Sequence, residues 1–372
     1  MSVLAKAVQN GSPTSLHNSP AQQIVKDHIT PSLESLIRKH VRGQPAGDGD
    51  ADDLVDKLMN GGRSIALPTT PGSDTRAATK SSRSAIRMST ASSAKLVSAC
   101  RTQGISVTSA VNAAIIRVTA QSAQAPEADS YVIWAPCDLR RPLIAAGVKE
   151  CLQPVGTYLS GLPLRIEGVV KYMENGESIP GKSFSTLASE LATFYSQDVE
   201  SYKLPSARSG KTVSLLQLAE PYVEKITKAF STFPLRGCPY PKTPVISSLG
   251  KLDEFIRNEY PKEGNDALPA SKLHITDFWV SCEVATPVII FNPWTWGGEI
   301  TLSAAFNESW YSTEFVGSIL GKAIGELVEG LKIGPVSYRT VNSTCFSSSR
   351  FHRTYVFLAN SIFQIATTPQ HN

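Results

Sequence analysis

The stretch PVIIFNPWTWGGEITLSAAFNESWY, residues 287–311, carries the strongest fold signal in this sequence. Two arms rich in β-branched and aromatic residues flank TWGG, and paired glycines between apolar arms are typical of a β-hairpin turn. Directly after it, Ser312 precedes apolar residues that recur at three- and four-residue steps. This pattern predicts a helix over 313–331 with Ser312 as its N-terminal cap. A hairpin followed by an amphipathic helix indicates helices packed on a sheet.

Upstream of the hairpin, short strands and amphipathic helices follow one another in no strict order. The helix predicted over 105–121 carries a continuous apolar stripe, so we expect it to be well buried, and Gly104 ends the helix before it. The stretch 155–166 is either a strand pair or one bent strand. This mixture of elements predicts an α/β layered sandwich. We expect the other strands at 84–89, 131–138, 245–256 and 273–285, and the other helices at 32–40, 52–59, 90–103, 184–202 and 213–230.

The two ends of the chain differ from this body. Residues 1–83 are rich in Gly, Ser, Pro, Asp and Thr, so we expect weakly ordered connecting structure there. Residues 84–334 form the body. The tail, 335–372, has no clean periodicity, and its apolar patch at 355–365 lacks a polar face. We interpret this tail as an atypical, strand-forming C-terminal extension.

Composition and charge argue against several classes of protein. Apolar residues make up 41% and charged residues 18% of the 372 residues, which is ordinary for a globular protein. The 36 basic and 32 acidic residues give a net charge of +4, and the basic residues do not cluster as they would in a nucleic-acid-binding protein. No window holds the ~18 apolar residues of a membrane helix, and residues 1–9 lack the apolar core of a signal peptide. We expect a cytoplasmic monomer with neither nucleic-acid nor membrane partners.

The cysteines show neither a CxxC motif nor metal-ligand spacing. Since a chain of this length folds without disulfides, we expect reduced, mostly buried thiols and no bound metal. The six are Cys100, Cys137, Cys151, Cys238, Cys282 and Cys345.

Signatures of several enzyme classes are absent from the sequence. It contains no GxSxG elbow, no GxGxxG after a strand, no Walker A loop and no HExxH. His274 lies in a predicted strand in which Leu273, Ile275, Asp277 and Trp279 occupy alternate positions. A lone strand histidine without an orienting partner is more often packed or half-exposed than catalytic, and we interpret His274 in that way.

Five segments, taken in order, carry a family resemblance. They are GISVTSAVNAAIIRVTA (104–120), PCDLRRPL (136–143), PVGTYLSGLPL (154–164), VISSLG (245–250) and the hairpin at 287–311. Together they resemble fungal acyltransferases similar to trichothecene O-acetyltransferases and to condensation-type domains, in the chloramphenicol-acetyltransferase-like superfamily. The resemblance covers about residues 84–331 and implies a chloramphenicol-acetyltransferase-like two-layer sandwich with an incomplete N-terminal subdomain. Residues 1–83 would then be a remnant of that subdomain and its crossover linker.

The resemblance implies a defined chemistry. In that family two subdomains meet around a solvent tunnel, and the histidine of an HHxxxDG motif deprotonates an acceptor hydroxyl that attacks the thioester of acyl-CoA. An alcohol is a weak nucleophile until such a base removes its proton, and hydrogen-bond donors stabilise the resulting oxyanion. The sequence contains no HHxxxDG, so no catalytic residue is assigned. Two explanations stay open: a truncated gene model whose start lies further upstream, which we favour, or a short protein that has lost its base.

Four residues match positions near the tunnel on the acceptor side. Asp138 and Arg140 match the family's Asp-Leu-Arg turn, and either Arg140 or Arg141 is expected to support the aspartate of the missing motif. Gly156 and Tyr158 match the strand that lines the acceptor channel.

Five more residues match the thioester side and a neighbouring loop. Ser247 and Ser248 match the segment beside the reacting thioester, where a hydroxyl can donate to the oxyanion. Trp294, Trp296 and Gly297 match a structural Gly/Trp loop, which here contains no Asp, so an Asp–Arg pair in that loop is not expected.

The resemblance therefore implies an acyl-CoA-dependent O-acyltransferase. Its partners would be acyl-CoA, as a co-substrate rather than a tightly bound cofactor, and a small-molecule alcohol such as a trichothecene-like sesquiterpenoid or a polyketide. The alternative, motivated by the absent motif, is a non-catalytic small-molecule-binding or scaffold protein derived from the same fold.

Overall fold

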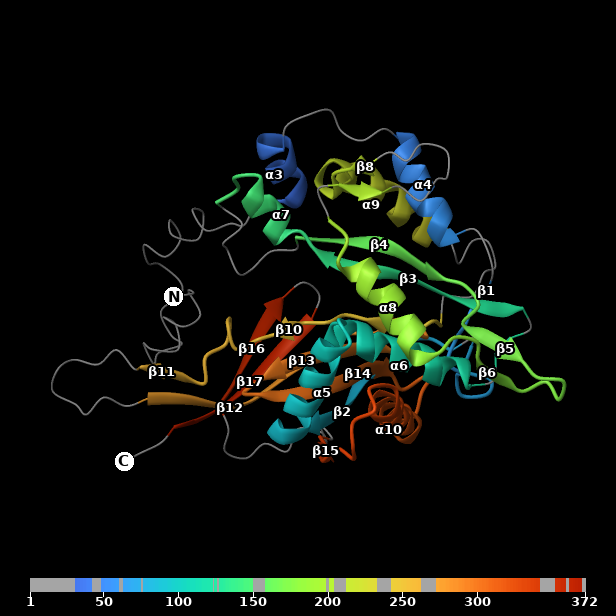
Figure 1. The fold of residues 1–372 in the computed structure, drawn as a ribbon. Coiled ribbons are helices and arrows are strands. Elements are labelled where there is room, and N and C mark those ends of the chain that lie inside the picture. Colours follow the sequence, from blue (N-terminus) through green and yellow to red (C-terminus); the bar gives the residue numbers. More distant parts are fainter. Residues whose placement is uncertain are drawn as a thin grey trace.

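Strands in several sheets, with helices packed on them, make up the molecule (Figure 1). In Figure 1 a three-stranded sheet lies above a larger, six-stranded sheet. The computed structural model describes residues 31–41, 48–59, 63–74, 76–122, 124–125, 127–149, 158–198, 201–203, 212–232, 242–261, 272–341, 352–358 and 361–369.

The predicted hairpin forms the middle of the larger sheet. Strands β13 (Ile290–Trp296) and β14 (Glu299–Asn307) pair antiparallel. The turn between them has positive φ at both Gly297 (59°) and Gly298 (76°). Two successive residues of this kind match the twist of paired strands, and glycine adopts the conformation without steric cost. The hairpin prediction is confirmed.

Four further strands complete the larger sheet. On the β14 side the order continues through β2 (Ser81–Met88) to β15 (Tyr338–Thr340), both antiparallel to their neighbours. On the other side β9 (Val245–Ile246) and β10 (Gly250–Lys251) each pair in parallel with β13. The predicted strand at 84–89 is confirmed, and it begins three residues earlier than expected.

The prediction of one continuous strand over 245–256 is wrong. Only the two dipeptides β9 and β10 form regular strands, although the N–H groups of Ser247, Leu249 and Leu252 also donate to carbonyls of β13. The chain then turns at Leu252, whose carbonyl accepts hydrogen bonds from the backbone N–H groups of Phe255 and Ile256. Once the N–H groups bond within the turn, they are no longer available to a neighbouring strand.

Three helices cover one face of the larger sheet, and each begins after a capping serine. The Oγ atoms of Ser89, Ser106 and Ser312 accept the backbone N–H three residues further on, at 3.3, 3.0 and 3.1 Å. Such caps satisfy N–H groups that have no partner inside the helix. These helix predictions, including the Ser312 cap, are confirmed. The helices are α5 (Thr90–Thr102), α6 (Val107–Ala120) and α10 (Thr313–Gly330).

Helix α6 lies at the centre of the molecule, in contact with α5, α10 and α8 (Phe184–Tyr195). Eleven of its residues are buried, which confirms the predicted burial. Helix α8 ends seven residues before the predicted residue 202. There Ser196 caps it, and Tyr202 begins a two-stranded ribbon. The ribbon consists of β7 (Tyr202–Lys203) and β8 (Thr212–Val213), and a second ribbon consists of β5 (Val170–Tyr172) and β6 (Ser178–Pro180).

The smaller sheet carries a second group of helices. Its middle strand, β3, pairs antiparallel with β4 and in parallel with β1. Within the described residues, the stretch 155–166 forms the single strand β4. After β3 the polar turn leads into the short helix α7, where only a turn was predicted. The strands are β1 (Arg63–Ser64), β3 (Ala128–Asp138) and β4 (Leu159–Ile166), and the helix is α7 (Arg140–Ala145).

Helices α3, α4 and α9 lie above β3 and β4 in Figure 1. The predicted helices at 32–40 and 52–59 are confirmed, and α4 begins four residues earlier than expected. Leu36 and Leu54 of these helices belong to the main hydrophobic core. The division of the chain at residue 83 stays a prediction. The bounds are α3 (Leu33–His40), α4 (Asp48–Met59) and α9 (Leu215–Thr232). None of the described helices is long and apolar enough to cross a membrane.

A four-stranded sheet includes the C-terminal tail, in the order β11-β12-β17-β16. The predicted strand at 273–285 is confirmed as β12, but its alternation is interrupted between Ile275 and Asp277. Beyond this irregularity Phe278 and Val280 are buried, whereas Asp277 and Trp279 are half-buried. One extra residue shifts the side-chain phase by one position, which the sequence pattern did not reveal. The strands are β11 (Glu259–Pro261), β12 (Lys272–Cys282), β16 (His352–Leu358) and β17 (Ser361–Pro369).

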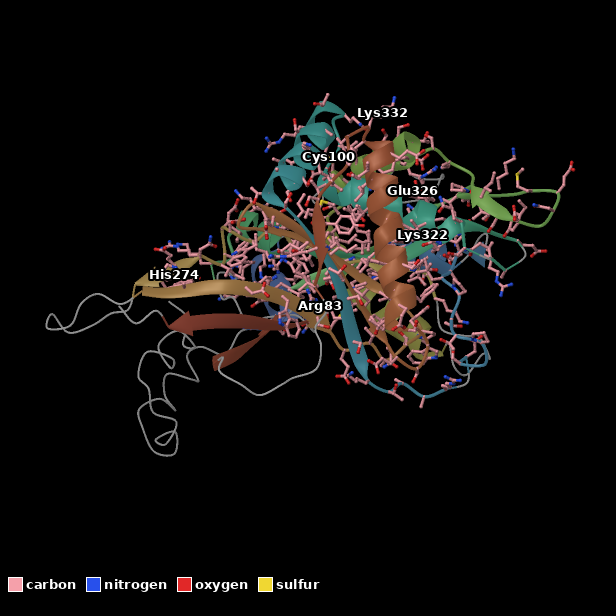
Figure 2. All side chains as sticks on the ribbon, turned by 90° about the horizontal axis from the view of Figure 1, so that it is seen from below. Arg83, Cys100, His274, Lys322, Glu326 and Lys332 are labelled. Atoms are coloured by element: carbon pink, nitrogen blue, oxygen red, sulfur yellow. The ribbon has the colours of Figure 1, made fainter. Side chains whose placement is uncertain are left out.

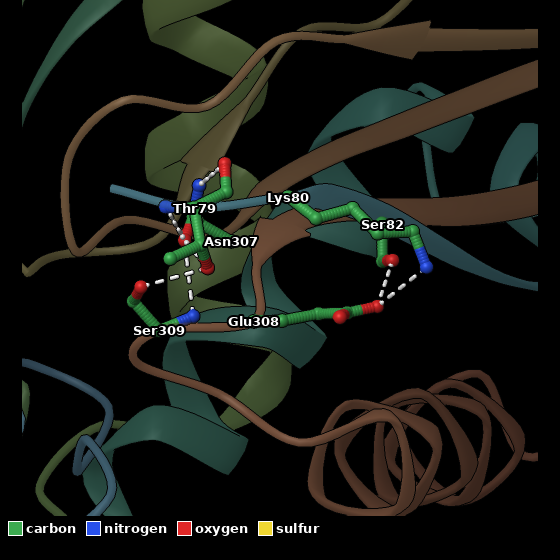
Figure 3. A network of polar contacts seen from close by, with 6 residues as sticks. All are labelled: Thr79, Lys80, Ser82, Asn307, Glu308 and Ser309. Atoms are coloured by element: carbon green, nitrogen blue, oxygen red, sulfur yellow. Dashed lines mark hydrogen bonds and ion pairs between the residues drawn. The ribbon is translucent and has the colours of Figure 1, made fainter. Parts of the chain in front are cut away.

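Asn307, at the end of β14, joins three segments of chain (Figure 3). Its Oδ1 atom accepts the backbone N–H groups of Thr79 (3.1 Å) and Ser309 (3.0 Å). Its Nδ2 atom donates to the carbonyls of Thr79 (3.0 Å) and Val284 (2.9 Å). The side chain is 1% exposed, so these bonds form away from water. Next to it the exposed Glu308 binds Lys80 at 3.1 Å and the Ser82 hydroxyl.

Three cysteines are free thiols: Cys100 is buried, and Cys137 and Cys282 are half-buried. The other three cysteines lie outside the described residues. Burial raises the pKa of the Cys100, Cys137 and Cys282 thiols to about 11, because it disfavours the charged thiolate. Since an unperturbed thiol has a pKa about two units lower, unfolding increases the thiolate fraction at pH 8 by about two orders of magnitude.

We therefore expect iodoacetamide at pH 8 to alkylate Cys100, Cys137 and Cys282 slowly in the folded protein and rapidly in denaturant. Peptide mass mapping after timed quenching measures the three rates separately. Rapid labelling of all three in the native state would contradict the burial described here.

Candidate functional site

Asp138, Arg140 and Tyr158 form a group where β3 meets α7. The Oδ1 atom of Asp138 accepts hydrogen bonds from the backbone N–H of Arg140 (3.1 Å) and from its Nη1 (3.0 Å). The guanidinium lies over the Tyr158 ring, 5.3 Å from its centre, and the Tyr158 hydroxyl donates to the Pro31 carbonyl at 3.1 Å. Arg140 is thus held within its own turn. Arg141 is exposed, so it is the more accessible of the two arginines predicted to support an aspartate.

Ser248 lies on the loop between β9 and β10, beside the first turn of α6. Its Oγ atom is 2.8 Å from Oγ1 of Thr108. The loop is fixed at its base, because the N–H of Ser247 donates to the Phe291 carbonyl at 2.9 Å and its carbonyl accepts from Nδ2 of Asn292 at 3.1 Å. Ser248 itself is exposed. An exposed hydroxyl on a fixed loop can donate a hydrogen bond to a developing oxyanion.

The predicted Gly/Trp loop stabilises the hairpin turn. Trp294 is 3% exposed and belongs to a small core that also contains Phe278. Nε1 of Trp296 donates to the Ile256 carbonyl at 3.1 Å. The N–H of Gly297 donates to Oδ1 of Asp253 at 2.8 Å. The loop therefore receives an aspartate contact from a segment 44 residues upstream, which sequence reasoning missed because no local pattern signals it.

An arginine pair on β2 was also missed. Arg83 and Arg87 lie four residues apart on the same face of the strand. Nη2 of Arg87 contacts Oδ1 of Asp277 at 2.6 Å. The Arg83 guanidinium lies over the rings of Trp279 and Trp294, at 5.4 and 5.9 Å from their centres. Burial lowers the pKa of Arg83 to about 10, although Asp277 opposes this shift. The spacing of the two arginines could have indicated this pair, because residues four apart in a predicted strand lie on the same face.

Among the buried polar atoms of this sheet face that have no hydrogen bond to the described residues are Oδ1 of Asn292 and Oγ of Ser303, on paired residues of β13 and β14. Buried polar atoms are normally hydrogen-bonded, so this face departs from the usual pattern.

The predicted site residues therefore fall into two groups on different sheets. Asp138, Arg140 and Tyr158 belong to the smaller sheet and its following turn, and the serine and tryptophan positions belong to the larger sheet. Gly156 lies outside the described residues. His274 is partly buried on β12, and its Nδ1 lies 3.4 Å from Oε1 of Glu259, so it does have a carboxylate neighbour, which the sequence did not predict. In Figure 2 His274 lies at the far end of β12, away from Arg83.

Comparison with solved structures identifies the fold. The structure is similar to that of TRI3, the trichothecene 15-O-acetyltransferase from Fusarium sporotrichioides, with a TM-score of 0.54 and 14% sequence identity over 75% of this chain and 52% of that one. The predicted fold class and the predicted resemblance in fold are confirmed. The EpoB cyclization-docking bidomain from Sorangium cellulosum matches with a TM-score of 0.48 and 12% identity, over 80% of this chain and 51% of that one.

Comparison by sequence gives one curated relative. The loline biosynthesis cluster 1 transcription factor lolU1 of Epichloe uncinata is 27% identical over 286 residues, which cover 76% of this chain and 54% of that protein. No protein-family model matches the chain. The chain thus spans about half the length of the proteins that it resembles.

Proposed function

We propose that these 372 residues provide the acyl-CoA- and acceptor-binding part of an O-acyltransferase. The proposed reaction is acetyl transfer to a hydroxyl of a fungal secondary metabolite, such as a trichothecene-like sesquiterpenoid or a polyketide. The observation that supports it most is the fold likeness to a trichothecene 15-O-acetyltransferase over three quarters of the chain. The exposed hydroxyl of Ser248, on its fixed loop, supports a role beside the thioester.

In this proposal the proton of the acceptor is removed by a group outside the 372 residues. Esterification needs a base near neutral pKa beside the hydroxyl, and the sequence contains no HHxxxDG. Ser248 would donate to the thioester oxygen as negative charge develops there, with Thr108 holding the Ser248 side chain. Arg141 would pair with a carboxylate of the segment that supplies the base.

The second candidate is a non-catalytic protein of the same fold that binds a small molecule or a partner. The absent motif favours it, and so does the name of lolU1, which assigns that relative to transcription rather than to acyl transfer. The two candidates differ in whether acetyl-CoA is a ligand.

Calorimetric titration of the purified chain with acetyl-CoA separates them. We expect saturable binding of acetyl-CoA to the unaltered chain. A Ser248→Ala variant should bind acetyl-CoA with an affinity within about threefold of that of the unaltered chain. The reason is that the proposed hydrogen bond from Ser248 to the thioester oxygen strengthens only as negative charge develops on that oxygen. Ser318→Ala, an exposed serine on α10 outside both the Ser248 loop and the hollows described below, is the matched control. A chain that binds duplex DNA but not acetyl-CoA in the same buffer would exclude the acyltransferase proposal.

A further inference from the structure

A basic, open hollow lies between the second half of α5 and the C-terminal end of α10, away from the residues discussed above. It has a volume of about 460 Å³, and the exposed residues Lys95 and Lys332 line it together with Ser98 and Thr102. We call this hollow the cavity below. None of its lining residues is acidic. Among the residues that the structure describes, neither Lys95 nor Lys332 forms an ion pair or a side-chain hydrogen bond, so two positive charges face this cavity without a counter-charge.

A position at the C-terminal end of its own helix explains Lys332 but not Lys95. A cation at the C-terminus of a helix is favoured by the helix dipole, which accounts for Lys332, two residues beyond α10. Lys95, however, is the sixth residue of α5 and lies far from that helix's C-terminus. Lys332 also has a φ of 55°, in a region that residues other than glycine rarely adopt. Its side chain therefore projects from an unusual backbone position next to the cavity.

Several carbonyl groups at these helix ends already accept hydrogen bonds from within the protein. The lysines therefore carry the main charge next to the cavity. The Ala99 and Cys100 carbonyls accept the N–H groups of Gln103 and Ile105, and the Leu331 carbonyl accepts Nε2 of Gln103. The Thr102 hydroxyl donates to the Ser98 carbonyl at 3.1 Å, so the donors that remain for a ligand are the two ammonium groups and the Ser98 hydroxyl. Ammonium and hydroxyl groups together form the kind of donor set that binds a phosphate.

Gln103 also lines a second, neighbouring hollow. This second hollow also measures about 460 Å³ and is lined by hydroxyl groups, among them those of Ser106 and Tyr195. Ser106 caps α6, and Thr108, two residues further on, contacts Ser248. The second hollow therefore borders the α5–α6 turn, two residues before the Thr108 that contacts Ser248. Figure 2 places Lys332 near Cys100 of α5, at the end of α10 beyond Glu326, with Lys322 further back along the helix.

We infer that Lys95 and Lys332 bind the phosphate monoester of a ligand. The group that they would bind is a dianionic phosphate, and the second hollow beside it leaves room for a hydroxylated part of the same ligand. Where that phosphate is the 3′-phosphate of coenzyme A, the inference rests on the proposed function. Where it is free phosphate, the inference is independent of it.

Calorimetric titrations at low ionic strength test the inference with three probes: coenzyme A, dephospho-coenzyme A, which lacks only the 3′-phosphate, and inorganic phosphate. The variant is Lys95→Gln/Lys332→Gln. The control is Lys322→Gln/Lys251→Gln, which removes the same charge from two exposed lysines outside the cavity. Thermal unfolding of both variants checks that the fold is retained.

We expect the Lys95→Gln/Lys332→Gln variant to bind coenzyme A at least tenfold more weakly than the unaltered chain and the control do. Dephospho-coenzyme A should bind the unaltered chain and this variant equally. If phosphate binding depends on the two lysines but coenzyme A does not bind, the site stands with free phosphate as its ligand and the acyl-CoA proposal fails. The inference is overturned if no probe binds, or if each probe binds equally to all three proteins. It is also overturned if the Lys95→Gln/Lys332→Gln variant loses only thermal stability, because the lysines would then stabilise the helix ends rather than bind a ligand.

Discussion

Asn307→Leu is expected to lower the free energy of unfolding by about 4 kcal/mol, because a buried amide that bonds three segments is replaced by a side chain of similar size without donors or acceptors. The N–H groups of Thr79 and Ser309 and the carbonyls of Thr79 and Val284 would then be left in the interior without their present partner. Each unsatisfied buried group costs about 1–3 kcal/mol, and relaxation recovers part of the sum. Urea denaturation monitored by tryptophan fluorescence measures the change.

The neighbouring residue provides the control for this prediction. Glu308→Gln removes an exposed carboxylate that binds Lys80 and Ser82, and an exposed ion pair contributes less than about 1 kcal/mol. We expect a decrease several times smaller than for Asn307→Leu. Equal effects of the two substitutions would show that Asn307 does not join these segments in the way described.

Glu326→Leu is expected to destabilise the protein by about 3 kcal/mol, because it leaves the Arg117 guanidinium in a mostly buried position without its carboxylate. Nε of Arg117, on α6, contacts Oε2 of Glu326, on α10, at 2.5 Å, and the two side chains are only 20% and 11% exposed. Nη1 of Arg117 also donates to the Lys182 carbonyl at 2.8 Å, so the arginine ties α6 to α10 and to the start of α8.

A double substitution separates the charge from the packing. In Arg117→Met/Glu326→Leu neither charge is buried, so we expect most of the lost stability to return, to within about 1 kcal/mol of the unaltered chain. Glu190→Gln, which breaks the more exposed pair of Lys182 and Glu190, should cost less than about 1 kcal/mol. If the double variant is as unstable as Glu326→Leu, the two side chains stabilise the protein through their packing and hydrogen bonds rather than by neutralising each other's charge.

The parts of the fold that the sequence predicted are those specified by neighbouring residues. The Gly297-Gly298 turn requires positive φ at two successive positions, and Ser312, the predicted cap of α10, lies directly before an apolar stripe. These signals act within one turn of chain, so they can be read without knowing the tertiary contacts.

The parts that were wrong or missing depend on contacts between distant segments. The turn at Leu252 and the irregularity after Ile275 change which side chains face the core, and neither has a local signature. In the candidate site, sequence reasoning proposed Ser248 but not Thr108, which is 140 residues away. Asp253 was missed for the same reason. Residue types can indicate a site, but its supporting contacts are set by the fold.

We propose that this chain binds an acyl-CoA and an alcohol, and that the base for their reaction comes from outside its 372 residues. The most direct test measures acetyl-ester formation from acetyl-CoA by mass spectrometry, with a panel of hydroxylated sesquiterpenoids and polyketides, for this chain and for a version extended upstream to include an HHxxxDG motif. We expect saturable transfer by the extended protein and no transfer above the uncatalysed rate by the 372-residue chain. Saturable transfer by the 372-residue chain alone, at the rate of the extended protein, would contradict the claim.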